Sequence, residues 1–474
     1  MHEHSFSRNA NDIKELLKQY EDLQSGKRKT FLEEEAFELI IEYYDEKDDF
    51  SKALEVAETS LEYFPYSSIL LIKKADLLIA TREYTRALEI LEQAQFYDVH
   101  NIDIYILKTD AFLALDMQQK AVDLLEEVLL FFQDDEKIDL LFELADVYDD
   151  YEEFDKVFEC LCHILELEPA NEEALYKICF WTDFTGRNEE SIRLHQKIID
   201  QQPYSELAWF NLGSAYQGLK LYEKAIDAYQ YAVVINEKFD YAYRNIGDAY
   251  IRLRKYKEAI EVLEKVGEIT RPEEVIYEAI GHCYHRLGNF AQARFNYRKA
   301  SHMSPGDSKL YYKIALTYIN EEQWQSAIKQ LENALRINRN SPEYHLALGQ
   351  CALQLKNYKD ATQYFSLVVR NRPKNVRGWE ALIKCLLESK HYDEAIQQCI
   401  SALKNTEGKS IFHFLYSTVL FAANKPKEAL IQLETGLKQT PQYLKKFFEL
   451  NPSILQNQQV VDMIARYKKP KRKK

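Results

Sequence analysis

The chain has 474 residues, of which 46% are hydrophobic and 29% charged, and its formal net charge is −15. This length is too great for a single domain of roughly 100–200 residues, and the hydrophobic fraction excludes a disordered chain. With only 13 Gly and 11 Pro, a β-rich protein with many turns is also excluded, so we expect an all-α protein of long helices joined by short connections.

Cysteine content and the lack of long apolar runs indicate the compartment. The seven cysteines are an odd number and are not paired at fixed spacings, which argues against a disulfide framework. The N-terminal sequence MHEHSFSRNANDIKELL lacks the apolar core of a signal peptide. The sequence has no run of about 18 apolar residues, so no membrane span is expected. We therefore expect a cytoplasmic protein, or a nuclear one if the cell is eukaryotic and the basic C-terminal tail acts as an import signal.

Residues 1–33 are predicted to contain one amphipathic helix. Ile13, Leu16, Leu17 and Tyr20 fall on one helical face, and Ser25-Gly26 ends the helix. The apolar face of this helix needs a partner in the chain that follows.

Proline and glycine recur after this helix at a spacing of 34 residues. Pro169 and Pro203 are 34 apart, and Gly213, Gly247 and Gly281 keep the same interval. A fixed period of this size indicates an array of helical repeats. The register predicts twelve repeats, with a two-residue insertion before the fourth, that start at Glu34, Ser68, Ile102, Ile138, Glu172, Glu206, Asp240, Glu274, Ser308, Pro342, Val376 and Ser410.

Each repeat is predicted to form two amphipathic helices. Positions 4, 7, 8 and 11 form one apolar stripe, and position 20, in the second helix, is alanine in ten of the twelve repeats. Small residues at positions 8 and 20 let the two helices approach closely. Six prolines at position 32 end the second helix, because the residue before a proline disfavours helix. Neither helix can bury its stripe alone, so neighbouring repeats must stack.

The repeat pattern resembles that of the tetratricopeptide repeat (TPR) family, as in AWFNLGSAYQGLKLYEKAIDAYQYAVVIN. The resemblance covers residues 34 to about 443 and implies an α-solenoid superhelix of about twelve 34-residue helix-turn-helix repeats. The array divides into the acidic repeats 1–4 (residues 34–171) and repeats 5–12 (residues 172–443). The repeats from Glu206 to Pro441 follow the family pattern well, whereas those before Glu206 are looser and lack glycine at position 8.

The segments outside the array are too short for a further domain. They hold 33 and 31 residues, below the roughly 50 residues of a small domain, so no appended catalytic domain is expected. We predict an N-terminal capping helix within residues 1–33 and a C-terminal capping helix over residues 444–465, because a solenoid must shield its terminal stripes. Partner-binding segments are the alternative for both ends.

Residues 466–474 form a basic tail with the sequence RYKKPKRKK. A disordered solubilising tail is one interpretation; contact with RNA, a ribosome or an anionic surface, or nuclear import, are the others. Its basic residues are Arg466, Lys468, Lys469, Lys471, Arg472, Lys473 and Lys474.

The candidate binding surface is the helix face that the core does not use. Positions 2, 5, 9 and 12 of each first helix lie roughly 130° around the helix from the packing stripe. The TPR resemblance implies that this face lines a concave groove that receives partner peptides. In repeats 1–4 ten of these sixteen positions are acidic and none is basic: Glu35, Glu38, Glu42, Asp45, Asp76, Asp103, Asp110, Asp139, Asp146 and Asp149.

From repeat 5 onward the same positions become aromatic and mixed in charge. They carry Tyr176, Phe180, Phe210, Tyr241, Tyr312, Phe414 and Phe421, together with Arg244, Lys309, Arg377 and Lys384. A solvated surface is the simpler interpretation for the acids, and some aromatic side chains can pack between repeats. A binding groove predicts a protein segment that is basic at one end and apolar or aromatic at the other.

Motifs of catalysis, metal binding and cofactor binding are absent from the sequence. It has no phosphate-binding Gly-rich loop, G-x-S-x-G elbow, H-E-x-x-H or C-x-x-C pair. His282, Cys283 and His285 are close together, but Cys283 occupies repeat position 10, as do Cys351 and Cys385, which indicates a small packing residue. The carboxylate clamp of chaperone-binding TPR proteins is also not expected, because Lys309 and Lys313 match it whereas Arg244, Asp248 and Ala279 do not.

The sequence therefore predicts a non-enzymatic scaffold or adaptor without a cofactor, which binds protein or peptide partners in the groove. A basic partner segment is expected for repeats 1–4. The alternative is a factor that associates with nucleic acid or ribosomes through the basic C-terminal half and tail.

Overall fold

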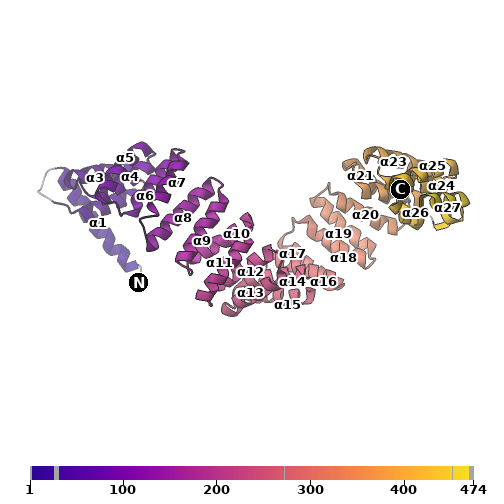
Figure 1. Ribbon diagram of the computed structural model, residues 1–474, viewed down its shortest axis with the longest axis horizontal. Helices are drawn as coiled ribbons and strands as arrows, with labels where there is room; N and C mark the ends of the chain where they lie inside the picture. The colour runs from indigo at the N-terminus through magenta and orange to yellow at the C-terminus, as the bar shows by residue number, and fades with distance from the viewer. Residues whose placement is uncertain (1–2, 26–30, 272, 451, 469–474) are drawn as a thin grey trace, which may run out of the picture. The chain divides into compact units, whose positions relative to one another are not determined.

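The structure is a computed structural model and describes residues 3–25, 31–271, 273–450 and 452–468. Contacts divide the chain into two compact units, Met1–Ala242 and Tyr243–Lys474. Within the described residues, each unit is a succession of α-helices joined by short turns, with α1 (Glu3–Gln24) at the start (Figure 1).

Helices α2 to α25 form twelve consecutive pairs, as predicted. The first helices of the pairs are α2 (Glu34–Asp45), α4 (Ser68–Ala80), α6 (Ile102–Ala114), α8 (Asp134–Asp150), α10 (Glu172–Thr185), α12 (Glu206–Gly218), α14 (Asp240–Arg252), α16 (Glu274–Arg286), α18 (Ser308–Asn320), α20 (Pro342–Gln354), α22 (Val376–Glu388) and α24 (Ser410–Ala422). Eleven of them begin at the residue that the 34-residue register gives.

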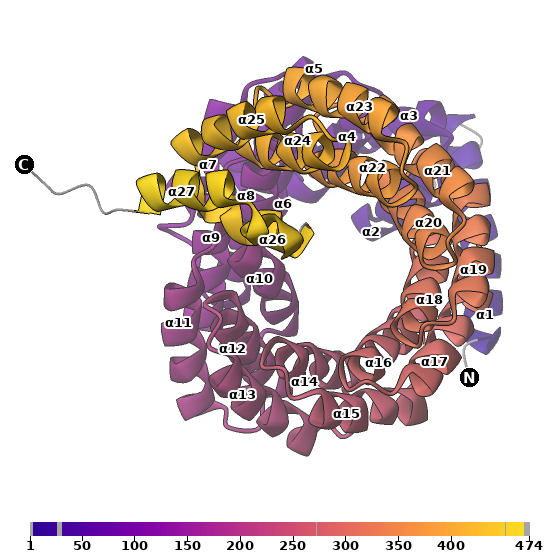
Figure 2. The same cartoon turned by 90° about the vertical axis from the view of Figure 1, so that its right-hand side faces the viewer.

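The second helices differ little in length. They are α3 (Phe50–Tyr63), α5 (Tyr84–Tyr97), α7 (Gln118–Val128), α9 (Phe154–Leu167), α11 (Asn188–Gln201), α13 (Tyr222–Ile235), α15 (Tyr256–Ile269), α17 (Phe290–Met303), α19 (Trp324–Ile337), α21 (Tyr358–Asn371), α23 (Tyr392–Asn405) and α25 (Pro426–Gln439). Within the second unit, α16, α18, α20, α22 and α24 lie on one side and α17, α19, α21, α23 and α25 on the opposite side (Figure 2).

The fourth repeat departs from the predicted register. Helix α8 begins at Asp134, four residues before Ile138, and has 17 residues. Helix α7 ends at Val128 after 11 residues, whereas every other second helix has 14. The two inserted residues therefore belong to a longer α8 that follows a shortened α7, and the link between repeats is not simply extended.

Close approach within the pairs depends on the small residues at positions 8 and 20. The ten alanines at position 20 are all fully buried. A Cβ atom added to Gly213 would lie 2.6 Å from the ring of Tyr229, and one added to Gly349 would lie 2.3 Å from the ring of Phe365. The aromatic ring of the second helix therefore occupies the space that a side chain at position 8 would need.

Local hydrogen bonds start and end the helices. Ser67, Asn171 and Ser205 cap α4, α10 and α12 by accepting from the backbone N–H three residues on. In eleven of the twelve turns between paired helices, the backbone N–H at position 16 donates to the carbonyl at position 11, as from Glu83 to Leu78 at 2.7 Å. This six-to-one bond is the Schellman pattern that ends helices.

Additional helices cover both ends of the array. Tyr20 of α1 is buried, and its ring lies edge-on to Phe37 of α2 at 6.2 Å. At the other end, α26 (Leu444–Leu450) and α27 (Gln458–Lys468) bring Phe447, Val460 and Ile464 into one core with α24 and α25, and the short 3-10 helices Pro441–Tyr443 and Pro452–Gln456 connect them. Among the residues described, none of the helices has both the length and the hydrophobicity to cross a membrane.

Candidate protein-binding faces

The ten predicted acids of repeats 1–4 share the outward side of α2, α4, α6 and α8, and we call them the acidic face. Eight of the ten side chains are exposed, and Glu38 and Asp45 are half-buried. The face follows from the helical period, because the packing positions of the same helices, such as Leu141 and Leu144 on α8, are buried.

Acids on successive helices of this face influence one another. Loss of surrounding water to the neighbouring helices raises the pKa of Asp76, and the charges of Asp45 and Asp103 raise it further. The same loss of water, followed by the charge of Asp76, raises the pKa of Asp110. The acidic face is therefore a region where negative charges repel each other across α2, α4 and α6.

Glu143 belongs to this region although the repeat positions did not identify it. Burial raises its pKa to about 7, and Asp110, Asp146 and Asp150 add to the shift. The sequence did carry a signal, because acids at 139, 143, 146 and 150 are spaced as one helical stripe on α8. Position 6, which Glu143 occupies, lies beside positions 2, 5 and 9 on the helix surface.

Two lysines at position 6 interrupt the negative charge. Lys73 lies 2.9 Å from Glu42, and Lys177 of α10 lies 2.9 Å from Glu173 and 3.7 Å from Asp146. The sequence prediction missed both lysines because it considered only positions 2, 5, 9 and 12. The face therefore carries less negative charge at these two points than the sequence predicted.

Three aromatic side chains continue this surface on α10. Tyr176 and Phe180, both predicted, are 63% and 60% exposed, and Phe184, four residues further on, is 57% exposed. The rings of Phe180 and Phe184 stack at 5.9 Å and rest against Trp181. Three exposed rings on one helix face form an apolar surface that core packing does not require.

The remaining predicted residues near the end of the first unit and the start of the second differ in accessibility. Phe210 is half-buried, 5.1 Å from the ring of Phe239, whereas Tyr241 is 63% exposed. The Arg244 guanidinium donates to both carboxylate oxygens of Glu273, at 2.9 and 3.3 Å. Arg244 is therefore already engaged by an acid of its own unit.

In the second unit a pocket of about 610 Å³ opens on the same face of α18, α20 and α22. Predicted residues Tyr312, Arg377 and Lys384 line it. Glu343 and Glu380 line it as well, so its charges are mixed. Lys309 is exposed on α18, while Lys313 is paired with Glu278.

Two predicted groove aromatics are placed differently by the structure. Phe414 is 1% exposed and lies in the core with Phe447 of α26, so its assignment to the groove was wrong. Phe421 is half-buried against the same core. The helices that follow the last pair cover position 5 of repeat 12, which is half-buried in most other repeats.

The cysteines at repeat position 10 are buried, and the two histidines of α16 are half-buried. Cys283, Cys351 and Cys385 are all fully buried, and burial raises the pKa of the Cys283 thiol to about 12. Burial also lowers the pKa of His282 and of His285. Within the described part of the chain, no group of three or more His, Cys, Asp or Glu side chains is arranged to hold a metal ion.

Only the start of the basic tail is described. Arg466 is exposed on α27, and Lys468 is the last residue of that helix. The predicted contact residues Lys469, Lys471, Arg472, Lys473 and Lys474 lie outside the described residues.

Comparisons with protein families match three stretches of the chain. The family described as "Tetratricopeptide repeat" matches residues 207–239, and a second family of the same description matches residues 241–271. The family described as "Anaphase-promoting complex, cyclosome, subunit 3" matches residues 286–366. Together with the 34-residue period and the twelve helix pairs, these matches identify the chain as a tetratricopeptide repeat protein.

Several solved structures are similar to this chain. The C-terminal part of a TPR repeat-containing protein from Cytophaga hutchinsonii is 16% identical and covers 54% of this chain and 99% of its own, with a TM-score of 0.44. The APC/C hetero-tetramer Cut9–Hcn1 is 15% identical over 84% of this chain and 97% of its own, with a TM-score of 0.35. YrrB, described as a TPR protein with an unusual peptide-binding site, is 16% identical over 40% of this chain and 96% of its own, with a TM-score of 0.35. A search of curated proteins gave no match.

Proposed function

We propose that this protein is a non-catalytic scaffold whose acidic face binds a basic segment of a partner protein. Tetratricopeptide repeats are typically non-catalytic and mediate protein–protein interactions, and the partial match to a subunit of a multiprotein complex supports a role in assembly. In this proposal the protein acts in the cytoplasm or nucleus, and it recognises its partner by charge and apolar contact.

The observation that carries the proposal is the mutual repulsion of acids on successive first helices. In addition to burial, the charge of Asp45 raises the pKa of Asp76, that of Asp76 raises the pKa of Asp110, and that of Asp110 raises the pKa of Glu143, along α2, α4, α6 and α8. Unpaired like charges raise the free energy of the unbound protein, and a cationic segment lying across these helices relieves that repulsion.

The exposed rings of α10 supply a second contact beyond the acids. Tyr176, Phe180 and Phe184 adjoin the acidic face through Lys177, which reaches Asp146 on α8. A partner segment with basic residues followed by apolar or aromatic ones matches this order of surfaces.

Affinity capture from native cells with quantitative mass spectrometry tests the proposal. The variant Glu38→Gln/Glu42→Gln/Asp76→Asn/Asp110→Asn, called the four-site variant, should lose partners that contain lysine- or arginine-rich segments. A matched control removes the same charge from exposed acids of second helices, as Glu62→Gln/Glu89→Gln/Glu92→Gln/Asp123→Asn, and should keep them. Identical partner sets for the four-site variant and the wild type would refute the acidic-face assignment.

The basic tail supports a second candidate function, contact with RNA or ribosomes. Seven of the nine residues in RYKKPKRKK are Lys or Arg, and phosphate contacts by such residues release counterions. A truncation after Ala465 should then abolish RNA binding that weakens steeply with salt. Absence of salt-dependent RNA binding by the full-length protein would exclude this function.

A further inference from the structure

The second helix of repeat 3 lacks about one turn. Helix α7 stops at Val128 with 11 residues, three fewer than each of the other second helices. Residues 129–131 then turn toward α8. The lost turn leaves space beside α8, while the packing residues Leu141 and Leu144 of α8 stay buried.

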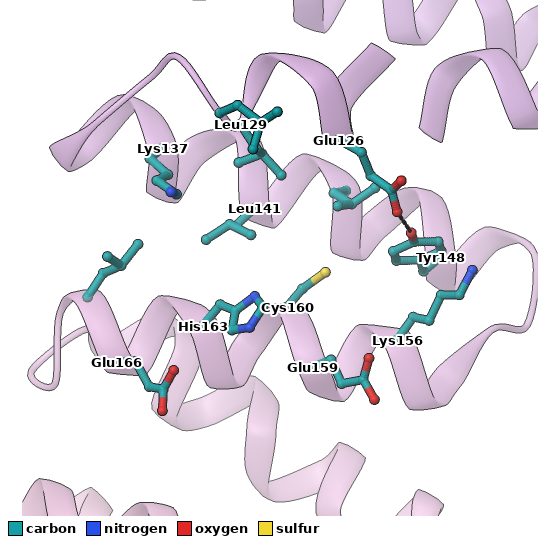
Figure 3. Close-up of a pocket in the computed structure, with 13 residues that line it drawn as sticks. Glu126, Leu129, Lys137, Leu141, Tyr148, Lys156, Glu159, Cys160, His163 and Glu166 are labelled. Carbon is teal, nitrogen blue, oxygen red and sulfur yellow. Dashed lines mark hydrogen bonds between the residues drawn. The ribbon is translucent and has the colours of Figure 1, made fainter. Parts of the chain in front are cut away.

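A pocket of about 520 Å³ occupies that place, and we call it the α7–α9 pocket (Figure 3). Its apolar wall consists of Leu129 after α7, Leu141 and Leu144 of α8, and Cys160 of α9. A comparable pocket between α15, α16 and α17, where α15 has its full 14 residues, measures about 320 Å³. Of these two pockets, the one beside the shorter second helix is therefore the larger.

Two large apolar side chains stand exposed at the pocket, where Leu130 is part of the lining and Phe131 follows it in the chain. Leu130 is 80% exposed and Phe131 is 67% exposed. Leu130 occupies repeat position 29, which in repeats 9–12 is a charged residue: Arg336, Arg370, Lys404 and Lys438. An apolar residue at this position is not required by the repeat, and together with the pocket it forms an apolar surface suited to a partner.

The charges around the pocket favour a cationic partner. Glu126, Glu159 and Glu166 line it, against Lys137 and Lys156. Lys156 is paired with Glu153 at 2.6 Å, Glu159 with Arg187 at 2.9 Å and Glu166 with Lys197 at 3.3 Å. Helix α8 begins with the exposed acids Asp134, Asp135 and Glu136 just before Lys137. Acids therefore outnumber bases around the opening.

We propose that the α7–α9 pocket binds an amphipathic helical segment of a partner protein. One large apolar side chain of the segment enters the pocket, and Leu130 and Phe131 contact the apolar face of the segment that carries this side chain. Lysine or arginine residues of the segment flank its apolar face. The segment supplies the turn of second helix that repeat 3 lacks. This surface uses packing positions of α8, such as Leu141 and Leu144, whereas the acidic face uses Asp139, Asp146 and Asp149 on another side of that helix.

The proposal is independent of the acidic-face function and adds a second binding surface to the first unit. Two partners can then be held at once, one by the acidic face and one by the α7–α9 pocket. Leu130 and Phe131 contribute little to the fold because they are exposed, so their replacement tests binding without unfolding the repeat.

The test uses full-length protein and a fluorescent helical peptide of leucine and lysine, about 14 residues long to span four turns. Its leucines fall on one helical face, and a second peptide of the same composition spreads them around the helix. Anisotropy should show that Leu130→Ser/Phe131→Ser weakens binding of the first peptide by at least about tenfold. The second peptide should bind at least about tenfold more weakly than the first.

The control is Val234→Ser, which removes an apolar residue that is 75% exposed at position 29 of repeat 6 and should change the affinity by less than about twofold. Repeating the titration in the four-site variant separates the two surfaces, and the effect of Leu130→Ser/Phe131→Ser should persist there. Unchanged binding after Leu130→Ser/Phe131→Ser overturns this proposal. Loss of peptide binding in the four-site variant, with binding unchanged in Leu130→Ser/Phe131→Ser, also overturns this proposal while supporting the acidic-face function.

Discussion

At the scale of single residues, the turn between paired helices imposes the same backbone conformation twelve times. Position 15 of every repeat has a positive φ, which ranges from 57° at Asp48 to 77° at Gly288. Only Gly186 and Gly288 of these twelve residues are glycines. A left-handed conformation costs other residues roughly 1–2 kcal/mol each. The recurring six-to-one backbone bond offsets this cost, because it satisfies the last carbonyl groups of the first helix.

Replacement of Gly288 by alanine should isolate this conformational cost. An added Cβ would meet nothing within 4 Å, so no clash contributes, and the free energy of unfolding should fall by about 1 kcal/mol. Urea denaturation followed by circular dichroism measures it. Gly306→Ala is the control, since that site is equally open and lacks a positive φ; equal losses in both variants would contradict the explanation.

His195 should make the first unit less stable in mild acid. The ring is fully buried, Nδ1 lies 2.8 Å from the carbonyl oxygen of Ser191, and burial lowers the pKa to about 4. In the unfolded chain the ring takes up a proton below its ordinary pKa of about 6.5. Protons therefore favour unfolding between pH 6.5 and 4, and about 2 kcal/mol should be lost between pH 7 and 5.

The variant His195→Gln should lose this part of the pH dependence, as measured by urea denaturation at both pH values. The exposed His163 of α9 offers a matched control, and His163→Gln should retain the wild-type difference. An equal fall in the free energy of unfolding for His195→Gln and the wild type would show that other groups are responsible.

Glu143 should make peptide binding at the acidic face depend on pH. Because burial raises its pKa to about 7, this carboxyl is largely protonated at pH 6 and ionised at pH 8. A lysine-rich peptide should bind the protein about two- to fivefold more tightly at pH 8, through one additional ion pair. Glu143→Gln should remove this difference while Asp139→Asn keeps it, and a pH-independent affinity of the wild type would contradict the role of Glu143.

At the scale of helices, the period predicted the pairs because alanine recurs at position 20 in ten of the twelve repeats, where it is fully buried. Starts such as Glu206 and Ser308 agree with the register. The start of α8 was not predictable, because the insertion lengthens α8 and shortens α7, a choice that the spacing of small residues does not determine. Phe414 was misassigned for a related reason: periodicity identifies a helix face but not the neighbour that covers it.

The candidate faces were predicted only in part. Outward positions identified Asp76, Asp110 and Phe180, whose exposure depends on their own helix. Glu143 and Lys73 were missed, because their effect depends on side chains of the preceding first helix, Asp110 and Glu42. Sequence period thus predicts which side of a helix faces outward, whereas the charge balance there depends on contacts between helices.

The covering of the last pair by α26 should contribute directly to stability. Phe447 is fully buried against Phe414, and Leu433 and Leu437 of α25 belong to the same core. Phe447→Ala should lower the free energy of unfolding by about 3–5 kcal/mol. Hydrogen exchange should become faster in α24 and α25 first, whereas the exposed substitution Tyr443→Ala should leave both helices unchanged. Unaltered exchange in Phe447→Ala would show that α26 is not needed to protect the pair.

At the scale of the whole molecule, the net charge of −15 hides two opposite regions. Residues 34–171 contain 36 acids and 10 bases, whereas residues 172–474 contain 34 acids and 45 bases. The first region therefore carries a net −26 and the second a net +11. Opposite charge on separate repeats favours different partners for each region and steers their association.

The central claim, that the acidic face binds basic protein segments, is tested most directly by one titration. The affinity of a fluorescent lysine-rich peptide for the full-length protein is measured by anisotropy at about 0.15 M salt. The four-site variant should bind at least about tenfold more weakly than the wild type. The variant Glu62→Gln/Glu89→Gln/Glu92→Gln/Asp123→Asn, which has the same net charge, should bind within about twofold of the wild type. Equal losses in the two variants would mean that net charge alone attracts the peptide, and would contradict the claim.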